Sequence, residues 1–280
     1  VQIIVAVFTL PLVAFFGHGN QQQGFLLTMM LFGVISLILI WNTFFHVRER
    51  FTNKKIAHQP VKQVLPMILK NQPWIRISIV ILLFWLVTAI KNQTAIYYFK
   101  YTLNKESLVP LANSFTLTSL IGVVLIMRLS SLHGNKKTML TGIVTAFGGQ
   151  LVLAAGVYLN TLPILFTGVV INAIGHGMVV GLVSIMIADT IRYGVTMGIQ
   201  AEGILAASDN FGVNVGLGVG GLITAGLFQL SGYASGQRQN TATLTMINWN
   251  YVWIPLAIYG LMFAVLWFYD EQTMQKALKI

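Results

Sequence analysis

The sequence predicts an all-α, polytopic membrane protein with about eight transmembrane helices. Of its 280 residues, 56% are hydrophobic and only 9% are charged, whereas soluble domains carry about 25% charged residues. The mean hydropathy is +0.76. Apolar runs recur at lengths near the roughly 17–25 residues that cross a bilayer, without the alternation typical of a transmembrane β-barrel. Helices are expected because each satisfies its own backbone hydrogen bonds in lipid.

The apolar runs place the helices in order along the chain. The opening stretch, 1–16, is slightly short for a full span and lacks the basic region and cleavage site of a signal peptide. We therefore expect a fragment that begins inside a helix. Fuller spans are predicted at 24–45, 76–99, 109–127, 138–158, 163–188, 204–230 and 249–269.

Basic residues divide the loops into two groups. The loops 46–75 and 128–137 and the carboxyl terminus are rich in Lys and Arg, whereas GHGNQQQG and YLNTLP on the opposite side have none. Lys100 and Lys105 are the exceptions. The positive-inside rule predicts that loops 46–75, 128–137 and 189–203 and the carboxyl terminus are cytoplasmic, in a plasma membrane such as the bacterial inner membrane. The net charge of +10 then reflects topology, and no nucleic-acid partner is expected.

The connection 46–75 is the only long one and predicts two helical bundles. Residues 1–45 would hold the last two helices of a first bundle, 76–270 a six-helix carboxyl-terminal bundle and 271–280 a cytoplasmic tail. Two bundles joined by a basic linker are typical of secondary transporters. The chain has no cysteine, so disulfides and Cys-based metal sites are excluded. No metal site or cofactor is predicted.

Three ionisable residues lie at bilayer depth, where such residues are costly and indicate function. Lys91 is followed by Asn92. Its side chain either faces a water-filled cavity, or extends toward the lipid headgroups (snorkelling) or pairs with another side chain in a structural role. His176 either relays a proton or binds a sugar hydroxyl, or is a neutral imidazole hydrogen-bonded across helices. Counted at roughly 1.5 Å per residue, Asp209 lies at a different depth from Lys91, so we expect no direct ion pair. Asn214 matches the depth of Lys91 better.

Aromatic and small residues near these positions also have alternative roles. Tyr97 and Tyr98 are typical of an interfacial aromatic belt, although one of them could face a cavity because adjacent helical residues point in different directions. Gly212, Gly216 and Gly220 recur every four residues on one helix face. This spacing predicts close helix packing.

The ends of two successive spans carry opposite charges. Asp189, Arg192 and Glu202 lie on the predicted cytoplasmic side. They form either a gate that opens and closes or a static, solvated network. The sequence leaves both interpretations open.

Other classes of membrane protein fit the sequence less well. An integral-membrane enzyme needs a catalytic cluster, and no His lies near the acids Asp189, Glu202 and Asp209 in the sequence. A channel favours rings of charge from identical subunits, and nothing here indicates them. A monomeric carrier of a small solute remains.

Four stretches carry a resemblance to a known family. They are KNQTAIYYFKYTL at 91–103, HGNKKTMLTG at 133–142, IADTIRYGVTMGIQAEGIL at 187–205, and a Gly-rich helix ending in LSGY at 230–233. Nearly the whole chain resembles the glycoside–pentoside–hexuronide:cation symporters, the melibiose-permease branch of the major facilitator superfamily. This resemblance implies a major facilitator-type helical bundle and transport of a sugar or sugar acid coupled to Na⁺ or H⁺. It also implies that most cation-binding carboxylates lie outside this fragment. Because fold does not fix function, a same-fold carrier of a non-sugar, even lipid-like, solute stays an alternative.

The chain departs from the family pattern in its third stretch and in the preceding helix. The second acid of the family's Ala-Asp-Thr motif falls on Arg192, and the motif's Glu falls on Val195. An aromatic residue of melibiose permease falls on Val180. These three positions therefore lack the two carboxylates and the aromatic ring that the resemblance would otherwise imply.

A further departure concerns the coupling charge. The family's lysine on the penultimate helix falls on Asn214, while Asp209 and Asn210 keep the polar pair that approaches the sugar in the family. We hypothesise that Lys91 supplies the positive charge that Asn214 lacks. Alternatively, Lys91 binds the carboxylate of an anionic substrate.

Overall fold

The computed structural model describes residues 2–46, 66–199 and 202–278. The chain divides into two compact units, 1–58 and 59–280. The division falls inside the predicted linker 46–75, most of which lies outside the described residues.

The first unit is a helical hairpin of α1 (Gln2–Gly17) and α2 (Gln21–His46). Asn20 begins α2, because its side-chain oxygen accepts a hydrogen bond from the backbone N–H of Gln22 at 3.1 Å. The two helices approach closely at Gly24, where an added Cβ would lie 2.3 Å from the carbonyl oxygen of Val13. These helices correspond to the predicted spans 1–16 and 24–45.

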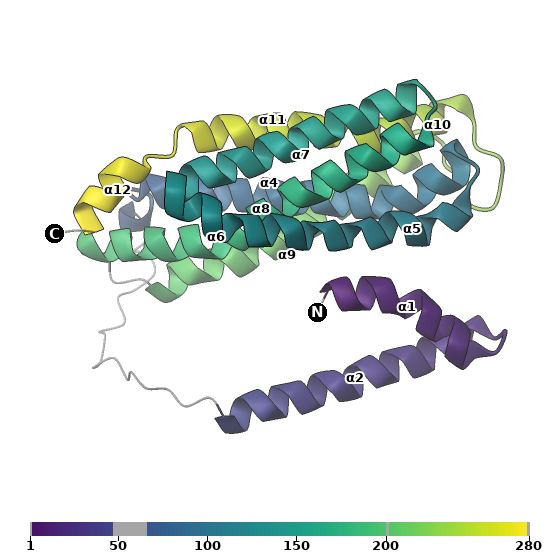
Figure 1. Ribbon diagram of the computed structural model, residues 1–280, viewed down its shortest axis with the longest axis horizontal. Helices are drawn as coiled ribbons and strands as arrows, with labels where there is room; N and C mark the ends of the chain where they lie inside the picture. The colour runs from purple at the N-terminus through teal and green to yellow at the C-terminus, as the bar shows by residue number, and fades with distance from the viewer. Residues whose placement is uncertain (1, 47–65, 200–201, 279–280) are drawn as a thin grey trace. The chain divides into compact units, whose positions relative to one another are not determined.

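Within its described residues, the second unit contains six membrane-length segments. A short helix, α12, follows the last of them (Figure 1). Three of the segments contain 3₁₀ or π-helical turns. In chain order, the elements are α4 (Gln72–Tyr97), η1 (Tyr98–Thr102), η2 (Glu106–Leu108), α5 (Val109–Ser114), η3 (Phe115–Thr118), α6 (Ser119–His133), α7 (Asn135–Tyr158), α8 (Leu162–Thr196), α9 (Glu202–Leu230), α10 (Thr241–Asn248), η4 (Trp249–Trp253), α11 (Ile254–Trp267) and α12 (Glu271–Leu278).

The prediction of a polytopic α-helical membrane protein is confirmed. In the described part of the chain, seven helical segments are long and apolar enough to cross a membrane. They comprise α2 and the six segments of the second unit. The eighth predicted span, α1, is helical over 16 residues.

Several predicted boundaries were wrong. The span expected at 163–188 continues as α8 to Thr196, so Asp189 and Arg192 lie on a helix rather than in the loop 189–203. A helix can continue past the bilayer because its backbone stays hydrogen-bonded while charged side chains reach water. The chain turns only at Gly198, whose φ is +76°. The span expected at 249–269 begins earlier, at Thr241, because the π-helical turn η4 joins α10 to α11.

The core of the second unit has two large apolar halves and a smaller cluster of Ile68, Ile199 and Leu205. One contains Phe84, Met178 and Met262, together with side chains near α12. The other is aromatic and contains Tyr98, Tyr251 and Phe228. On α4, α7 and α8, the residues of the first half and those of the second half are separated by several positions along the helix. Polar side chains occupy this intervening layer, as described below.

Candidate functional site

Lys91 lies in a polar layer between the two apolar halves of the second unit. Its Nζ donates a hydrogen bond to Gln150 Oε1 on α7 at 2.9 Å and another to Asn172 Oδ1 on α8. Gln150 is fully buried and Asn172 is 5% exposed, whereas Lys91 is partly exposed. Three helices therefore meet at a single ammonium group. We call Lys91, Gln150 and Asn172 the mid-span cluster.

Both amides are held in one orientation by backbone carbonyls. Gln150 Nε2 donates to the carbonyl oxygens of Tyr251 at 2.8 Å and Val252 at 3.1 Å, both in the π-helical turn η4. Asn172 Nδ2 donates to the carbonyl oxygen of Ala146 at 2.7 Å. With the NH₂ groups so engaged, the amide oxygens must point toward Lys91. The cluster thus presents two preorganised acceptors to a cation.

The backbones of α7 and α8 approach very closely beside the cluster. A Cβ added at Gly149, next to Gln150, would lie 2.3 Å from the backbone nitrogen of Asn172. Only glycine permits this approach. The approach brings two short amide side chains within reach of one lysine.

Lys91 has no carboxylate partner among the described residues, where Lys100–Glu106 is the single ion pair. An ammonium has three N–H donors, and two of those of Lys91 are engaged. The side chain points toward α7 and α8. Asn92, the next residue, is exposed.

His176 lies one turn after Asn172 on α8. Like Asn172, it contacts a side chain of α4. Its Nε2 is 3.1 Å from Thr88 Oγ1, and its ring is 4.5 Å from that of Phe84. The Thr88 hydroxyl donates to the carbonyl oxygen of Phe84 at 2.7 Å, so the imidazole Nε2–H is the donor to Thr88. His176 and the mid-span cluster therefore form successive polar links between α4 and α8.

The polar residues of α9 lie on a different surface. Asn210 and Asn214 are exposed and Asp209 is partly exposed. Asn214 Nδ2 donates to the carbonyl oxygen of Asn210 at 2.8 Å, within the same helix. The structure does not bring these residues into contact with the mid-span cluster.

The glycine-rich face of α9 packs on α4. A Cβ added at Gly216 would lie 2.7 Å from the carbonyl oxygen of Leu82 and 2.8 Å from Trp85 Cβ. Gly212 and Gly220 lie on the same face. A Cβ added at Gly212 would lie 2.8 Å from Ile81 Cγ2, and one added at Gly220 would lie 2.7 Å from the carbonyl oxygen of Leu86. Backbone atoms cannot yield as a flexible side chain can, so this contact requires small residues.

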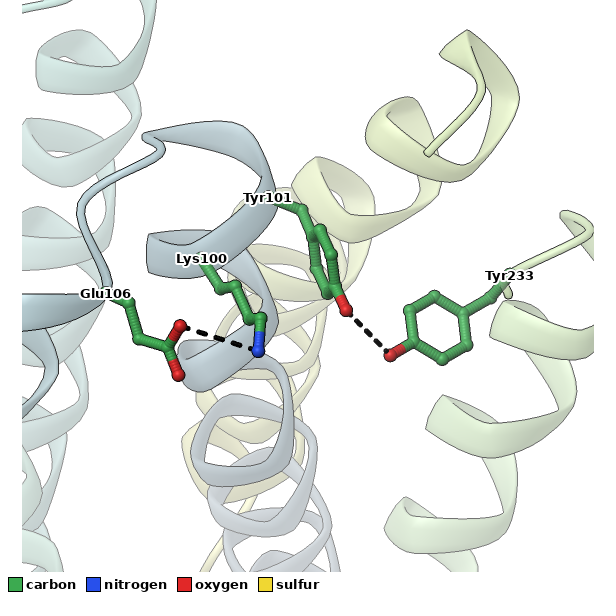
Figure 2. A network of polar contacts seen from close by, with 4 residues as sticks. All are labelled: Lys100, Tyr101, Glu106 and Tyr233. Atoms are coloured by element: carbon green, nitrogen blue, oxygen red, sulfur yellow. Dashed lines mark hydrogen bonds and ion pairs between the residues drawn. The ribbon is translucent and has the colours of Figure 1, made fainter. Parts of the chain in front are cut away.

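The two tyrosines after Asn92 have different surroundings. Tyr98 is fully buried and its ring stacks on Tyr251 at 4.5 Å. Tyr97 is partly exposed and stacks on Tyr101 at 6.4 Å. The hydroxyl groups of Tyr101 and Tyr233 are 3.3 Å apart, next to the ion pair of Lys100 with Glu106 at 3.4 Å (Figure 2). This end of α4 is therefore joined to the chain after α9 by aromatic and polar contacts.

The other end of the unit carries the residues predicted as a gate. Asp189 accepts a hydrogen bond from Asn135 Nδ2 at 3.2 Å, while Arg192 is exposed. The side chain of Glu202 lies outside the described residues. The structure therefore brings Asp189 to the start of α7 and shows no contact between Asp189 and Arg192 in the described part of the chain.

Sequence reasoning missed a carboxylate at this end. Glu271 Oε1 accepts hydrogen bonds from the backbone N–H groups of Asn135 at 2.9 Å and Lys136 at 3.3 Å, which caps the N-terminus of α7. Tyr269 lies nearby and is 1% exposed. Burial raises the pKa of Tyr269, and the charges of Asp189 and Glu271 raise it further. The predicted tail 271–280 is thus in part a docked helix, α12.

Gln150 and Asn172 were also not predicted, because neither side chain is charged. Their signal was present: each is an uncharged amide inside an apolar run, and such residues form hydrogen bonds between transmembrane helices.

Comparison with known proteins identifies a family that the chain matches. Residues 1–271 match the model of the family described as MFS/sugar transport protein. The chain belongs to this family. Its membership confirms the resemblance found in the sequence and makes the chain part of a multi-pass membrane transporter family rather than an enzyme family.

Among relatives in this MFS sugar-transport family, the isoprimeverose transporter of Lactiplantibacillus pentosus is 31% identical over 97% of this chain and 58% of its own length. The glucuronide carrier protein homolog of Escherichia coli (strain K12) is 26% identical over 84% of this chain and 52% of its own length. An uncharacterized symporter of Bacillus subtilis (strain 168) is 28% identical over 95% of this chain and 59% of its own length. The chain thus spans a little over half the length of these relatives.

Proposed function

We propose that the full-length protein is a secondary active transporter that carries a sugar, glycoside or sugar acid by alternating access, coupled to Na⁺ or H⁺. The mid-span cluster is the observation that carries this proposal. A lysine and two buried amides converge from three helices between two apolar halves of the core. Polar groups at bilayer depth are costly and mark substrate or ion pathways.

The class of solute follows from family membership and from the exposed polar groups. Relatives are named for isoprimeverose and for glucuronides, which supports a carbohydrate. Asn92, Asn210 and Asn214 are exposed amides on α4 and α9, and amides both donate to and accept from sugar hydroxyls. Tyr97 and Asp209, which are partly exposed, and His176 are further candidates for contact with the solute.

Lys91 favours an anionic sugar over a neutral one. Its ammonium has no anionic partner in the described part of the chain and uses two of its three donors on amides. A substrate carboxylate would accept a hydrogen bond from the third N–H of Lys91 and neutralise the charge of the ammonium. A neutral glycoside would leave the ammonium held by amide oxygens alone.

The binding site of the coupling cation requires side chains beyond the residues that the structure describes. We expect its carboxylates mostly on helices outside this chain. As the alternative to binding an anionic substrate, we propose that Lys91 supplies the positive charge that Asn214 lacks. The positive-inside rule orients the loops 46–75 and 128–137 and the carboxyl terminus toward the cytoplasm of the bacterial inner membrane. We propose a monomer, since one chain of this fold encloses its own pathway.

The end of the unit near α12 is proposed as the cytoplasmic gate. Asp189, Arg192 and Glu202 lie at the ends of two successive helices. Asp189 bonds to Asn135 at the start of α7, so a movement of α8 relative to α7 would break a specific contact. This contact is one that alternating access could open and close.

Counterflow in proteoliposomes tests the proposed function. Purified full-length protein is reconstituted, loaded with unlabelled glycoside or glucuronide, and offered the labelled compound outside. A carrier gives transient, saturable accumulation, and an inward Na⁺ or H⁺ gradient drives net uptake. Linear, non-saturating flux across a panel of sugars and sugar acids contradicts a sugar carrier.

A further inference from the structure

A basic cavity lies at the end of the second unit where α4 and α7 begin and α11 ends. Its volume is about 560 Å³, and Arg76, Lys136 and Lys137 line it together with Trp267 and Phe268. In Figure 1 this is the end at which α12 follows α11. The cavity is separate from the mid-span cluster, and it lies at the same end of the unit as the proposed gate.

The basic side chains of the cavity have more N–H donors than the hydrogen bonds that they make. Arg76 donates to the carbonyl oxygen of Phe268, and Lys136 Nζ donates to that of Trp267 at 2.8 Å. A guanidinium has five N–H donors and an ammonium has three, so most remain available. Lys137 lines the same cavity and is exposed.

The carboxylates beside the cavity do not cancel this charge. Glu271 Oε1 is engaged by two backbone N–H groups at the start of α7. Asp270 accepts from the N–H and hydroxyl groups of Thr273 at 3.0 Å and 2.7 Å. With three cations and two carboxylates on its wall, the cavity keeps a net positive charge.

The cavity lies where membrane-spanning helices meet lipid headgroups. Arg76 is in the second turn of α4, Lys136 and Lys137 are in the first turn of α7, and Trp267 is the last residue of α11. Trp267 and Phe268 are 60% and 69% exposed. Exposed aromatic rings at helix ends are typical of the membrane interface. A ligand here would meet cations on one side and an apolar wall on the other.

We propose that this cavity binds the phosphodiester headgroup of an anionic phospholipid. The phosphate accepts hydrogen bonds from Arg76, Lys136 and Lys137, and the first carbons of the acyl chains lie against Trp267 and Phe268. Basic pockets between transmembrane helices are suited to such headgroups. The aromatic wall selects a lipid over free phosphate, because inorganic phosphate gains nothing from apolar contact.

Native mass spectrometry of the full-length protein tests this site. The protein is titrated with phosphatidylglycerol, with phosphatidylcholine, and with inorganic phosphate as competitor. Lys137→Gln is the main variant, because the side chain of Lys137 makes no hydrogen bond or ion pair within the described part of the chain, and Lys136→Gln is the second. Lys105→Gln, an exposed lysine in the loop after η1, is the matched control.

Phosphatidylglycerol retention is expected to fall about fivefold in Lys137→Gln and to stay unchanged in Lys105→Gln. Phosphatidylcholine should bind more weakly than phosphatidylglycerol to the wild type, and millimolar phosphate should not displace the lipid. Equal retention in Lys137→Gln and wild type overturns the proposal. Displacement by inorganic phosphate at matched concentration also overturns it, since it indicates a site for free phosphate.

Discussion

The Nζ of Lys91 on α4 lies 2.9 Å from Oε1 of Gln150 on α7, and Gln150 in turn donates to two carbonyls of η4. A single amide therefore connects a charged residue at mid-span to a π-helical turn. Isolated π-helical turns recur at functional sites. Gln150 gives the carbonyls of Tyr251 and Val252 in this turn a hydrogen-bond donor from another helix.

Replacing Gln150 by Leu is expected to destabilise the protein by about 1–3 kcal/mol, because Lys91 and two carbonyls of η4 lose their buried partner. Thermal unfolding in detergent measures the effect. Gln237→Leu, at an exposed glutamine, is the control and should leave the midpoint unchanged. The double variant Lys91→Leu with Gln150→Leu should recover part of the loss. Strict additivity of the two changes contradicts a coupled pair.

The seam between α4 and α9 gives a second prediction. Gly216→Ala places a methyl group 2.7 Å from the carbonyl oxygen of Leu82, so it should cost about 1–3 kcal/mol through overpacking. Gly218→Ala is the matched control, since a Cβ there meets nothing within 4 Å. Unfolding midpoints of the two variants are compared. A Gly216→Ala protein as stable as Gly218→Ala shows that the helices do not pack this closely.

Much of the fold follows from the sequence, and the reason is physical. Each membrane span can be identified from a run of apolar residues, because lipid is the solvent for its surface. Lys91 stood out for the same reason, as a charge within such a run. Its partners could not be predicted, because Gln150 and Asn172 are 59 and 81 residues away and their meeting depends on helix rotation and on the close approach at Gly149.

The ends of helices were harder to predict than their middles. Apolar runs stop at the edge of the bilayer, but helices do not, as the extension of α8 to Thr196 shows. The capping of α7 by Glu271 joins positions 136 residues apart. Nothing in the local sequence of either segment indicates that contact.

Glu271→Gln is expected to weaken the cap of α7 by about 0.5–2 kcal/mol, since the carboxylate faces the positive end of a helix dipole. Glu106→Gln is the control, because its ion pair with Lys100 is exposed and such pairs contribute little. Hydrogen exchange of the first turn of α7 reports the difference. Equal protection in the two variants contradicts the capping role.

The contact between Tyr101 and Tyr233 predicts a pH dependence. Burial raises the pKa of Tyr233 to about 12, and the hydrogen bond with Tyr101 acts in the same direction. A raised tyrosine pKa favours the neutral folded form, so this stabilisation is present below pH 10 and is lost as the pH rises toward 12. Unfolding midpoints between pH 9 and 12 should fall less steeply in Tyr233→Phe than in the wild type. Identical slopes contradict the prediction.

Transport itself tests the role of Lys91. If the ammonium binds an anionic substrate, Lys91→Ala should reduce glucuronide uptake about tenfold or more, since a hydrogen bond to a charged group is lost. Uptake of a neutral glycoside should change much less. Lys105→Ala, an exposed lysine outside the cluster, controls for expression and charge. If Lys91 instead supplies the coupling charge, both substrates lose their dependence on the cation gradient. Wild-type uptake of both compounds with unchanged ion dependence rejects both roles and leaves Lys91 as a structural link between α4, α7 and α8.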